Sequence, residues 1–325
     1  MSNQSFNTSD AVPLLSDFVL AGLSLFVSFF GITGNSIVLW ILVFQLPKNK
    51  YSVYIINLSA ADLLFLLFCL PVMILTFLEM AISGLYFRTV EEVLSSFSIF
   101  GYNTGLYLLT AISSERCLSV IFPLWYQCKR PKRLSEIVCV LIWMLSFLVT
   151  CGEFFMSMDT NHDHSGETSS YEDTMFAIVI LLSFVLFAPV MIISNITLLI
   201  KIYQNSLKPQ AAGLYLTISG IICLFVFLAL PLRVVTILDY RHIFSPDSLI
   251  FLTVFFSSLN CSLNPFVYLF VGGRGKKSLG CKQRLQRIFG EGASGLNSSQ
   301  PDTETQPESQ TAASCLQVNS IKSKS

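Results

Sequence analysis

Charged residues are scarce in this sequence: Asp, Glu, Lys and Arg together make up 12% of its 325 residues. That share is about half of what soluble domains carry. Hydrophobic residues reach 53%, which is more apolar surface than one soluble core can bury and which also excludes disorder for most of the chain. The nine cysteines are too few and too scattered for a disulfide scaffold. The composition therefore indicates an integral membrane protein.

Motifs for catalysis and cofactor binding are also missing. The sequence has no internal repeat, no Gly-rich phosphate loop, no nucleophile beside a base and no clear set of metal ligands. His162 and His164 flank one acid in an expected outer loop, where a solvated loop is favoured over a weak metal site. We therefore expect no enzyme activity, no metal, no cofactor and no nucleic-acid partner.

Seven stretches nearly free of charge predict seven transmembrane helices. A helix needs roughly 20 apolar residues to cross the hydrocarbon, and it satisfies its own backbone hydrogen bonds there. Six stretches are long enough alone, and the fourth is long enough with its apolar flanks. The stretches are residues 18–47, 51–78, 93–114, 137–152, 174–200, 209–232 and 248–273. The expected fold class is an all-α, seven-transmembrane helix bundle with a short amphipathic eighth helix.

The basic residues near the ends of these stretches predict the orientation. Fifteen Lys and Arg residues fall on one side and three on the other. Because basic loops stay in the cytosol, the N-terminus is expected outside and the C-terminus inside, with the protein in the plasma membrane. Asn3 and Asn7 are glycosylation acceptors on the expected outer side.

Four segments follow from this topology. We expect an extracellular N-terminus at 1–16, the bundle at 17–273, an amphipathic helix on the membrane surface at 274–289 and a disordered cytoplasmic tail at 290–325. Cys281 in the amphipathic helix either carries palmitate or stays an ordinary thiol.

Strongly polar residues inside the spans are the first functional candidates, because they are costly in hydrocarbon. Asp62 is the only acid deep in a span, and Asn35, Asn260 and Asn264 fall at a comparable depth. Asn260 and Asn264 share one helix face. These four residues predict either one buried hydrogen-bond network or a purely structural tie between helices.

Two motifs make the pattern specific. Glu115-Arg116-Cys117 closes the third span, and Asn264-Pro265-Phe266-Val267-Tyr268 closes the seventh. Each Pro inside a span removes a backbone hydrogen bond and allows a kink. The residues that carry the overall pattern are Gly34-Asn35, Leu58 to Asp62, Glu115 to Cys117, Trp143, Pro189, Phe225, Pro231 and Asn264 to Tyr268.

With these residues, the sequence resembles the rhodopsin-like G-protein-coupled receptors over residues 15–290. Within that class, Phe100 to Leu106 and Arg116 to Pro131 are similar to the Mas-related receptors. The resemblance implies that agonist binding opens the cytosolic face for a heterotrimeric G protein, Gq by preference or Gi, with arrestin as a possible second partner. It assigns activation and coupling roles to Asp62, Asn35, Glu115, Arg116, Phe122, Pro123, Leu124, Phe225, Pro231, Asn260, Asn264, Pro265 and Tyr268.

The sequence departs from the family pattern at several positions. Ala229 replaces the aromatic switch of the sixth span, and Gly105 replaces the small hydroxyl residue that helps to form a sodium site near Asp62. The acid that pairs with the Arg of the third span is missing, with Ala211 nearby. These differences leave the sodium site open and imply weak inhibition at rest.

Acidic residues dominate the expected outer side, where thirteen Asp and Glu face three basic residues. Such a surface attracts cations, although acidic outer loops also follow from the topology itself. The resemblance points to Glu153 on the fourth span, with Glu172 or Asp173 near the fifth, as the ligand's partners. Ser98 stands where amine receptors carry an acid, and Tyr102 is a candidate for the pocket floor. Arg233 is expected to pair internally with Asp239 or Glu153.

These observations favour a receptor for a basic peptide or cationic amphiphile. The alternative within receptors is high basal activity or a neutral, lipid-like ligand. A transporter is a remote alternative: transporters usually show repeated halves, and this sequence has none.

Overall fold

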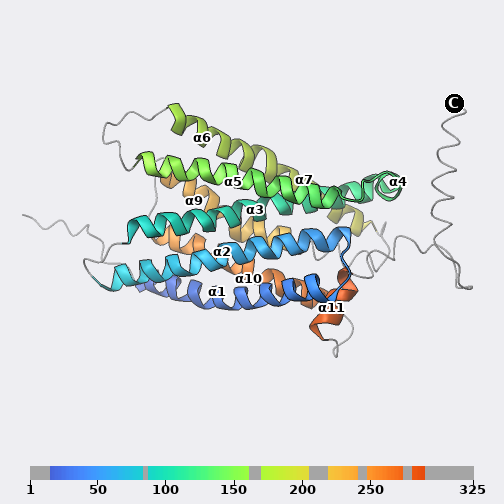
Figure 1. Ribbon diagram of the computed structural model, residues 1–325, viewed down its shortest axis with the longest axis horizontal. Helices are drawn as coiled ribbons and strands as arrows, with labels where there is room; N and C mark the ends of the chain where they lie inside the picture. The colour runs from blue at the N-terminus through green and yellow to red at the C-terminus, as the bar shows by residue number, and fades with distance from the viewer. Residues whose placement is uncertain are drawn as a thin grey trace, which may run out of the picture.

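Long helices lie side by side in one bundle in the computed structural model, which describes residues 15–82, 87–160, 170–204, 219–240, 247–273 and 280–289 (Figure 1). The predictions for Asn3, Asn7, Ala211 and the tail fall outside these residues. The elements are α1 (Leu15–Trp40) with η1 (Ile41–Gln45), α2 (Lys50–Ala81), α3 (Arg88–Ile121), α4 (Pro123–Cys128), α5 (Leu134–Thr160), α6 (Ser170–Ile180) with η2 (Leu181–Phe187) and α7 (Ala188–Tyr203), η3 (Phe225–Ala229) with α9 (Leu230–Tyr240), α10 (Asp247–Gly273) and α11 (Cys281–Phe289).

Six helical segments in the described residues are long and apolar enough to cross a membrane. The long helix α3 is the seventh member of the bundle and is less apolar, because it carries Ser, Thr, Asn and Tyr along much of its length. It contacts α2, α5 and α7 and buries most of its middle, so its polar groups face protein instead of lipid. The predicted seven-helix fold is confirmed.

The prolines of the fifth and sixth spans follow π-helical turns. Pro189 comes after η2, where the backbone N–H of Ala188 bonds to the carbonyl of Ser183. Pro231 comes after η3, where the N–H of Leu230 bonds to the carbonyl of Phe225. A proline ring clashes with the carbonyl four residues earlier, and the wider turn relieves that clash. The two spans therefore change their winding where the sequence predicts a break.

Two glycines allow helices to approach closely. A Cβ on Gly101 of α3 would lie 2.6 Å from the backbone nitrogen of Phe65 and 2.9 Å from the carbonyl oxygen of Ala61 on α2. A Cβ on Gly31 of α1 would clash with the hydroxyl group of Ser262 on α10. These contacts fix the depth and rotation of the helices that carry the site.

The short helices α4 and α11 lie at the same end of the bundle (Figure 1). In α11, Leu285 is buried and the Arg284 guanidinium donates to the carbonyl of Leu269 at 3.3 Å. Residues 274–279 of the expected eighth helix fall outside the described part of the chain, and the helix itself starts at Cys281, whose side chain is exposed.

Candidate functional site

A pocket of about 410 Å³ lies between the first turns of α3 and the second half of α5, and we call it the outer pocket because the sequence predicts this end of the bundle to be extracellular. It is rich in acids, with one arginine among them, and α10 closes it with Ile250. The lining residues are Arg88, Glu91, Glu92, Ser95, Ser96, Ile99, Thr150, Glu153, Phe154 and Ile250.

An ion pair forms the inner wall of this outer pocket. Glu153 of α5 and Arg233 of α9 approach to 2.5 Å, and each is 2% exposed. The sequence left Arg233 two possible partners, Glu153 and Asp239, and the structure places it on Glu153. Because both charges are withdrawn from water, each depends on the other for compensation. The pair therefore links the fourth span directly to the outer half of the sixth.

Neutral polar side chains extend this ion pair across the bundle. The amide of Asn103 on α3 donates to Glu153 and to the hydroxyl of Thr150, both at 3.1 Å. Arg233 also donates from Nε to the Ser183 hydroxyl in η2 at 3.3 Å. Four helical segments thus meet at one buried network, and a change in the charge of Glu153 would reach all of them.

Glu91 is the carboxylate of the outer pocket that has no cationic partner among the described residues. It accepts a hydrogen bond from the Thr76 hydroxyl at 2.9 Å. Partial burial and, to a lesser degree, the nearby Glu79 raise the pKa of Glu91 above its usual value, against the lowering effect of Thr76. In contrast, Glu92 pairs with Arg88 at 3.1 Å on the surface. A cation that enters the pocket would therefore relieve the unfavourable charge of Glu91.

The other predicted ligand residues have different surroundings. The Ser98 hydroxyl donates to the carbonyl of Phe65 at 3.3 Å and joins α3 to α2. The Tyr102 hydroxyl donates to the carbonyl of Ala229 at 3.0 Å, below the outer pocket. Glu172 and Asp173 belong to α6 and Asp239 to α9, but their side chains lie outside the described part of the structure.

Sequence reasoning did not single out four residues that the structure brings to Glu153 or its pocket. Glu91 and Glu92 entered the sequence reasoning as two of the thirteen acidic residues on the expected outer side, without a role of their own. Their position directly before an apolar span was an available signal. Thr150 lies one turn before Glu153, which a helical spacing would have shown. No feature of the sequence indicated that Asn103 contacts Glu153 and Thr150, since this contact depends on how α3 is rotated in the bundle.

Near the middle of the membrane, two of the four predicted polar residues bond directly. The Asn264 amide donates to Asp62 at 2.7 Å, and the Cys261 thiol also interacts with Asp62. The Asn35 amide donates instead to the carbonyl of Cys261 at 3.0 Å. The Oδ1 atom of Asn260 is buried and has no hydrogen-bond partner among the described residues. The arrangement ties α1 and α2 to α10, one turn before Pro265.

At the opposite end of the bundle, Glu115 pairs with α4 and its following loop instead of with Arg116. It forms an ion pair with Arg130 and accepts from the Tyr126 hydroxyl at 3.2 Å. Burial raises the pKa of Tyr126, so this tyrosine stays a protonated donor. The Arg116 guanidinium lies over the ring of Tyr51, 3.4 Å from its centre.

The remaining predicted activation residues lie in α10, the sixth span and the start of α4. Tyr268 is fully buried, and the rings of Phe225 and Tyr102 lie 5.8 Å apart between the sixth span and α3. Pro231 lies two residues before Arg233 in α9. Phe122, Pro123 and Leu124 form the start of α4, where Phe122 is 54% and Leu124 65% exposed.

Among the residues that the structure describes, no group of three His, Cys, Asp or Glu side chains is placed to hold a metal ion. The chemistry available in the outer pocket is electrostatic: carboxylates that attract a cation, and one ion pair that a cation would disturb.

The sequence is similar to known proteins along most of its length. The sequence profile of the 7 transmembrane receptor (rhodopsin family) matches residues 34–268. The Proto-oncogene Mas of Rattus norvegicus is 40% identical over 280 residues, which cover 85% of this chain and 83% of that protein. The Mas-related G-protein coupled receptor member H of Mus musculus is 38% identical, covering 82% of each chain. The member X1 of Homo sapiens is 36% identical, covering 78% of this chain and 77% of the relative.

Proposed function

The chain belongs to the Mas-related receptors of the rhodopsin family, and on that premise we propose that it senses a basic peptide or a cationic amphiphile. Membership makes it a multi-pass membrane receptor that couples to G proteins and not an enzyme. The observation that carries the proposal about the ligand is the acidic outer pocket, where Glu91 lacks a cationic partner among the described residues.

The ion pair of Glu153 and Arg233 supplies a trigger. A ligand's ammonium or guanidinium group that reaches Glu153 competes with Arg233 for the same carboxylate. Once displaced, Arg233 loses the main compensation of its charge, and α9 loses its tie to α5. Because Pro231 and η3 lie directly below, the released outer half changes the angle of the inner half of the sixth span. Ligand binding thus shifts the equilibrium toward an open cytosolic face.

The open cytosolic face engages the G protein through Arg116 and through apolar residues at the start of α4. Arg116 leaves the ring of Tyr51, and Phe122 and Leu124 offer exposed apolar contacts at the start of α4. We favour coupling through Gq over Gi, and we place the receptor in the plasma membrane with its N-terminus outside. In this topology Asn3 and Asn7 carry glycans, Cys281 is open to palmitoylation, and a phosphorylated tail recruits arrestin.

The test is intracellular calcium in cells that express the wild-type chain, Glu91→Gln or Glu153→Gln, challenged with basic peptides and neutral controls. We expect basic peptides alone to act and Glu91→Gln to lower their potency about tenfold, which corresponds to one lost charge contact. Glu136→Gln is the matched control, because this exposed acid starts α5 at the opposite end of the bundle. Equal potency in wild type and both pocket variants, at equal surface expression, would reject charge capture.

Such a result would favour the neutral or lipid-like ligand. Agonist-free signalling well above that of untransfected cells, unchanged in Glu153→Gln, would point to high basal activity instead.

A further inference from the structure

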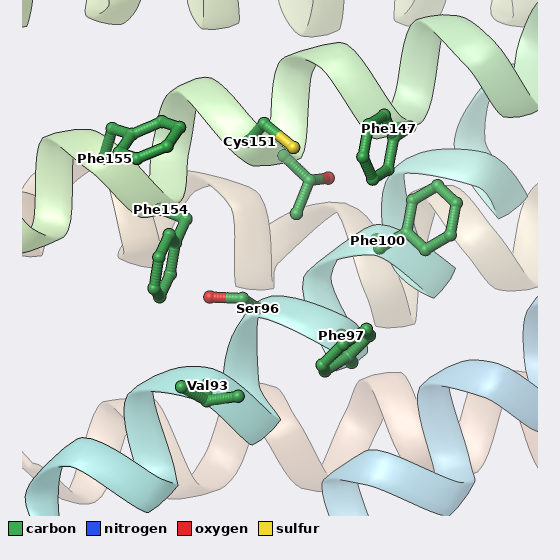
Figure 2. A pocket seen from close by; sticks show the side chains of 9 residues that line it. Val93, Ser96, Phe97, Phe100, Phe147, Cys151, Phe154 and Phe155 are labelled. Atoms are coloured by element: carbon green, nitrogen blue, oxygen red, sulfur yellow. The ribbon is translucent and has the colours of Figure 1, made fainter.

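A second cavity, of about 300 Å³, lies between α3 and α5 beside the outer pocket. Figure 2 shows phenylalanine rings from both helices around it, with the Cys151 thiol on the α5 side. We call it the phenylalanine pocket; its main lining residues are Phe97, Phe100, Phe147, Cys151, Phe154 and Phe155.

The phenylalanine pocket opens toward lipid. Its α5 residues belong to the apolar span Leu134–Phe155. Phe97, Phe147 and Phe155 are 46%, 54% and 60% exposed, and an exposed ring at this depth faces hydrocarbon instead of water. A molecule dissolved in the bilayer can therefore reach this cavity without crossing the aqueous outer pocket.

The two cavities share a wall. Ser96 of α3 and Thr150 and Phe154 of α5 line both of them. Thr150 also accepts the hydrogen bond from Asn103, which in turn bonds to Glu153. One side of the wall thus carries carboxylates and the other carries aromatic rings, and the wall itself belongs to the network of the ion pair.

We propose that the phenylalanine pocket holds the apolar chain of a single-chain amphiphilic cation whose charged group lies in the outer pocket at Glu91. This proposal rests on the proposed function and narrows its ligand class. The juxtaposition of charge and apolar surface excludes a purely polar cation as the best occupant. A cation supplied from the bilayer also arrives at a high local concentration, because its chain partitions into the membrane.

The chain gains little from leaving lipid for the pocket, since both surroundings are apolar. Its role is positional: it holds the charged group at the depth of Glu91 and Glu153. The affinity of such an amphiphile should therefore depend on the chain and on the carboxylate together, and tetramethylammonium or dodecanol alone should bind poorly.

The test uses the free thiol of Cys151 in the full-length protein, reconstituted in phosphatidylcholine nanodiscs. N-ethylmaleimide labelling of each cysteine is followed by mass spectrometry, with dodecyltrimethylammonium, tetramethylammonium or dodecanol present. We expect saturating dodecyltrimethylammonium to slow labelling of Cys151 about tenfold. Cys223 is the internal control, because it is an exposed free thiol on another span. Equal slowing at both thiols, or none at Cys151, would overturn the proposal.

Three variants sharpen the result. Glu91→Gln should raise the concentration of dodecyltrimethylammonium needed for protection about tenfold. Cys151→Phe fills the pocket and should remove calcium signalling by dodecyltrimethylammonium while leaving that by short basic peptides. Leu148→Phe is the matched control, since Leu148 is 63% exposed on the same helix and does not line the pocket. The same loss in Leu148→Phe would assign the effect to the lipid-facing surface in general and reject the site.

The outcomes separate the two proposals. Basic peptides that act through Glu91 while Cys151 stays unprotected would leave the proposed function standing and reject the phenylalanine pocket. Protection of Cys151 that depends on Glu91, in a protein that no cation activates, would keep the pocket and reject the proposed function.

Discussion

Glu153 and Arg233 show how one contact between two residues can serve both stability and signalling. Both side chains are almost fully buried, so neither charge can fall back on water if the other is lost. A buried pair of this kind contributes little net stability over apolar residues, but breaking it from one side is costly. Under the proposed function, the same asymmetry would let a competing cation disturb the pair.

Removal of either charge should destabilise the protein more than removal of both. We expect Glu153→Gln and Arg233→Gln each to cost about 3–5 kcal/mol of unfolding free energy, because the remaining charge stays buried and unpaired. The double variant should recover part of this loss. Thermal unfolding of the purified protein, followed by circular dichroism, measures the effect.

Arg88→Gln is the control for that series, because its pair with Glu92 is exposed at Arg88 and should be worth less than about 1 kcal/mol. Additive losses in the double variant would contradict a direct coupling between the two buried charges.

Protonation of Glu91 should weaken cation binding. Burial and Glu79 raise the pKa of Glu91, so its carboxylate begins to take up protons closer to neutral pH than an ordinary glutamate. A raised folded-state pKa also means that this residue favours folding more as the pH falls through that value, so titration of Glu91 itself would not unfold the protein. Agonist potency should therefore fall as the pH drops from about 7.5 to about 5, and less steeply in Glu91→Gln. Parallel pH curves for the two proteins would argue against Glu91 as the titrating group.

The residue scale also shows where sequence reasoning ends. The sequence points to Glu153 through the family resemblance, and to Arg233 as a charge at the end of a span that needs an internal partner. It does not choose between Glu153 and Asp239 as the partner of Arg233, since that choice depends on how α5 and α9 are rotated toward each other. Residue types predict which groups need partners, and packing decides which partners they find.

At the scale of the elements, close helix packing rests on single glycines. Gly101 faces the backbone of α2 and has no room for a Cβ, whereas a Cβ on Gly105 one turn later would meet nothing within 4 Å. Both lie in the middle of α3, so the intrinsic preference of a helix for Ala over Gly is the same at each site. The two positions therefore form a matched pair in which only the neighbouring helix differs.

Gly101→Ala should destabilise the protein by about 1–3 kcal/mol, because α2 and α3 would have to separate. Gly105→Ala should stabilise it by about 0.5–1 kcal/mol, because it removes the conformational freedom of glycine without a clash. Thermal unfolding of the two purified variants provides the comparison. A Gly101→Ala variant as stable as Gly105→Ala would show that α2 and α3 do not pack this closely.

The elements themselves were largely predictable. Long uncharged stretches locate the spans, and prolines mark where the helices change winding. Both features depend on neighbouring residues in the chain, so the sequence alone predicts them. The π-helical form of η2 and η3 was not predicted, although proline explains it once seen. The sequence also treated the third span as one more apolar run, while α3 is polar in its middle. A central helix can be polar because the surrounding helices shield it from lipid. The sequence alone does not show which helices surround it.

At the scale of the whole molecule, each end of the bundle carries a contact between an arginine and a group on another helix. Outside, Arg233 rests on Glu153; inside, Arg116 rests on the ring of Tyr51. The sequence implied weak inhibition at rest, because the acid that usually holds this arginine is missing. The contact with Tyr51 offers a different restraint, in which an aromatic face of α2 takes the place of a carboxylate on the sixth span.

Loss of the aromatic face should therefore raise agonist-free signalling. A desolvated contact between a guanidinium and a ring is worth about 2 kcal/mol, enough to shift the closed-to-open equilibrium by roughly thirtyfold. We expect Tyr51→Ala to raise basal inositol phosphate production several-fold at equal surface expression. Tyr51→Phe should stay near wild type, because it keeps the ring and removes only the hydroxyl. If Tyr51→Ala instead lowers basal and agonist-driven signalling together, the contact belongs to the open state, and Arg116 must be restrained at rest by other groups.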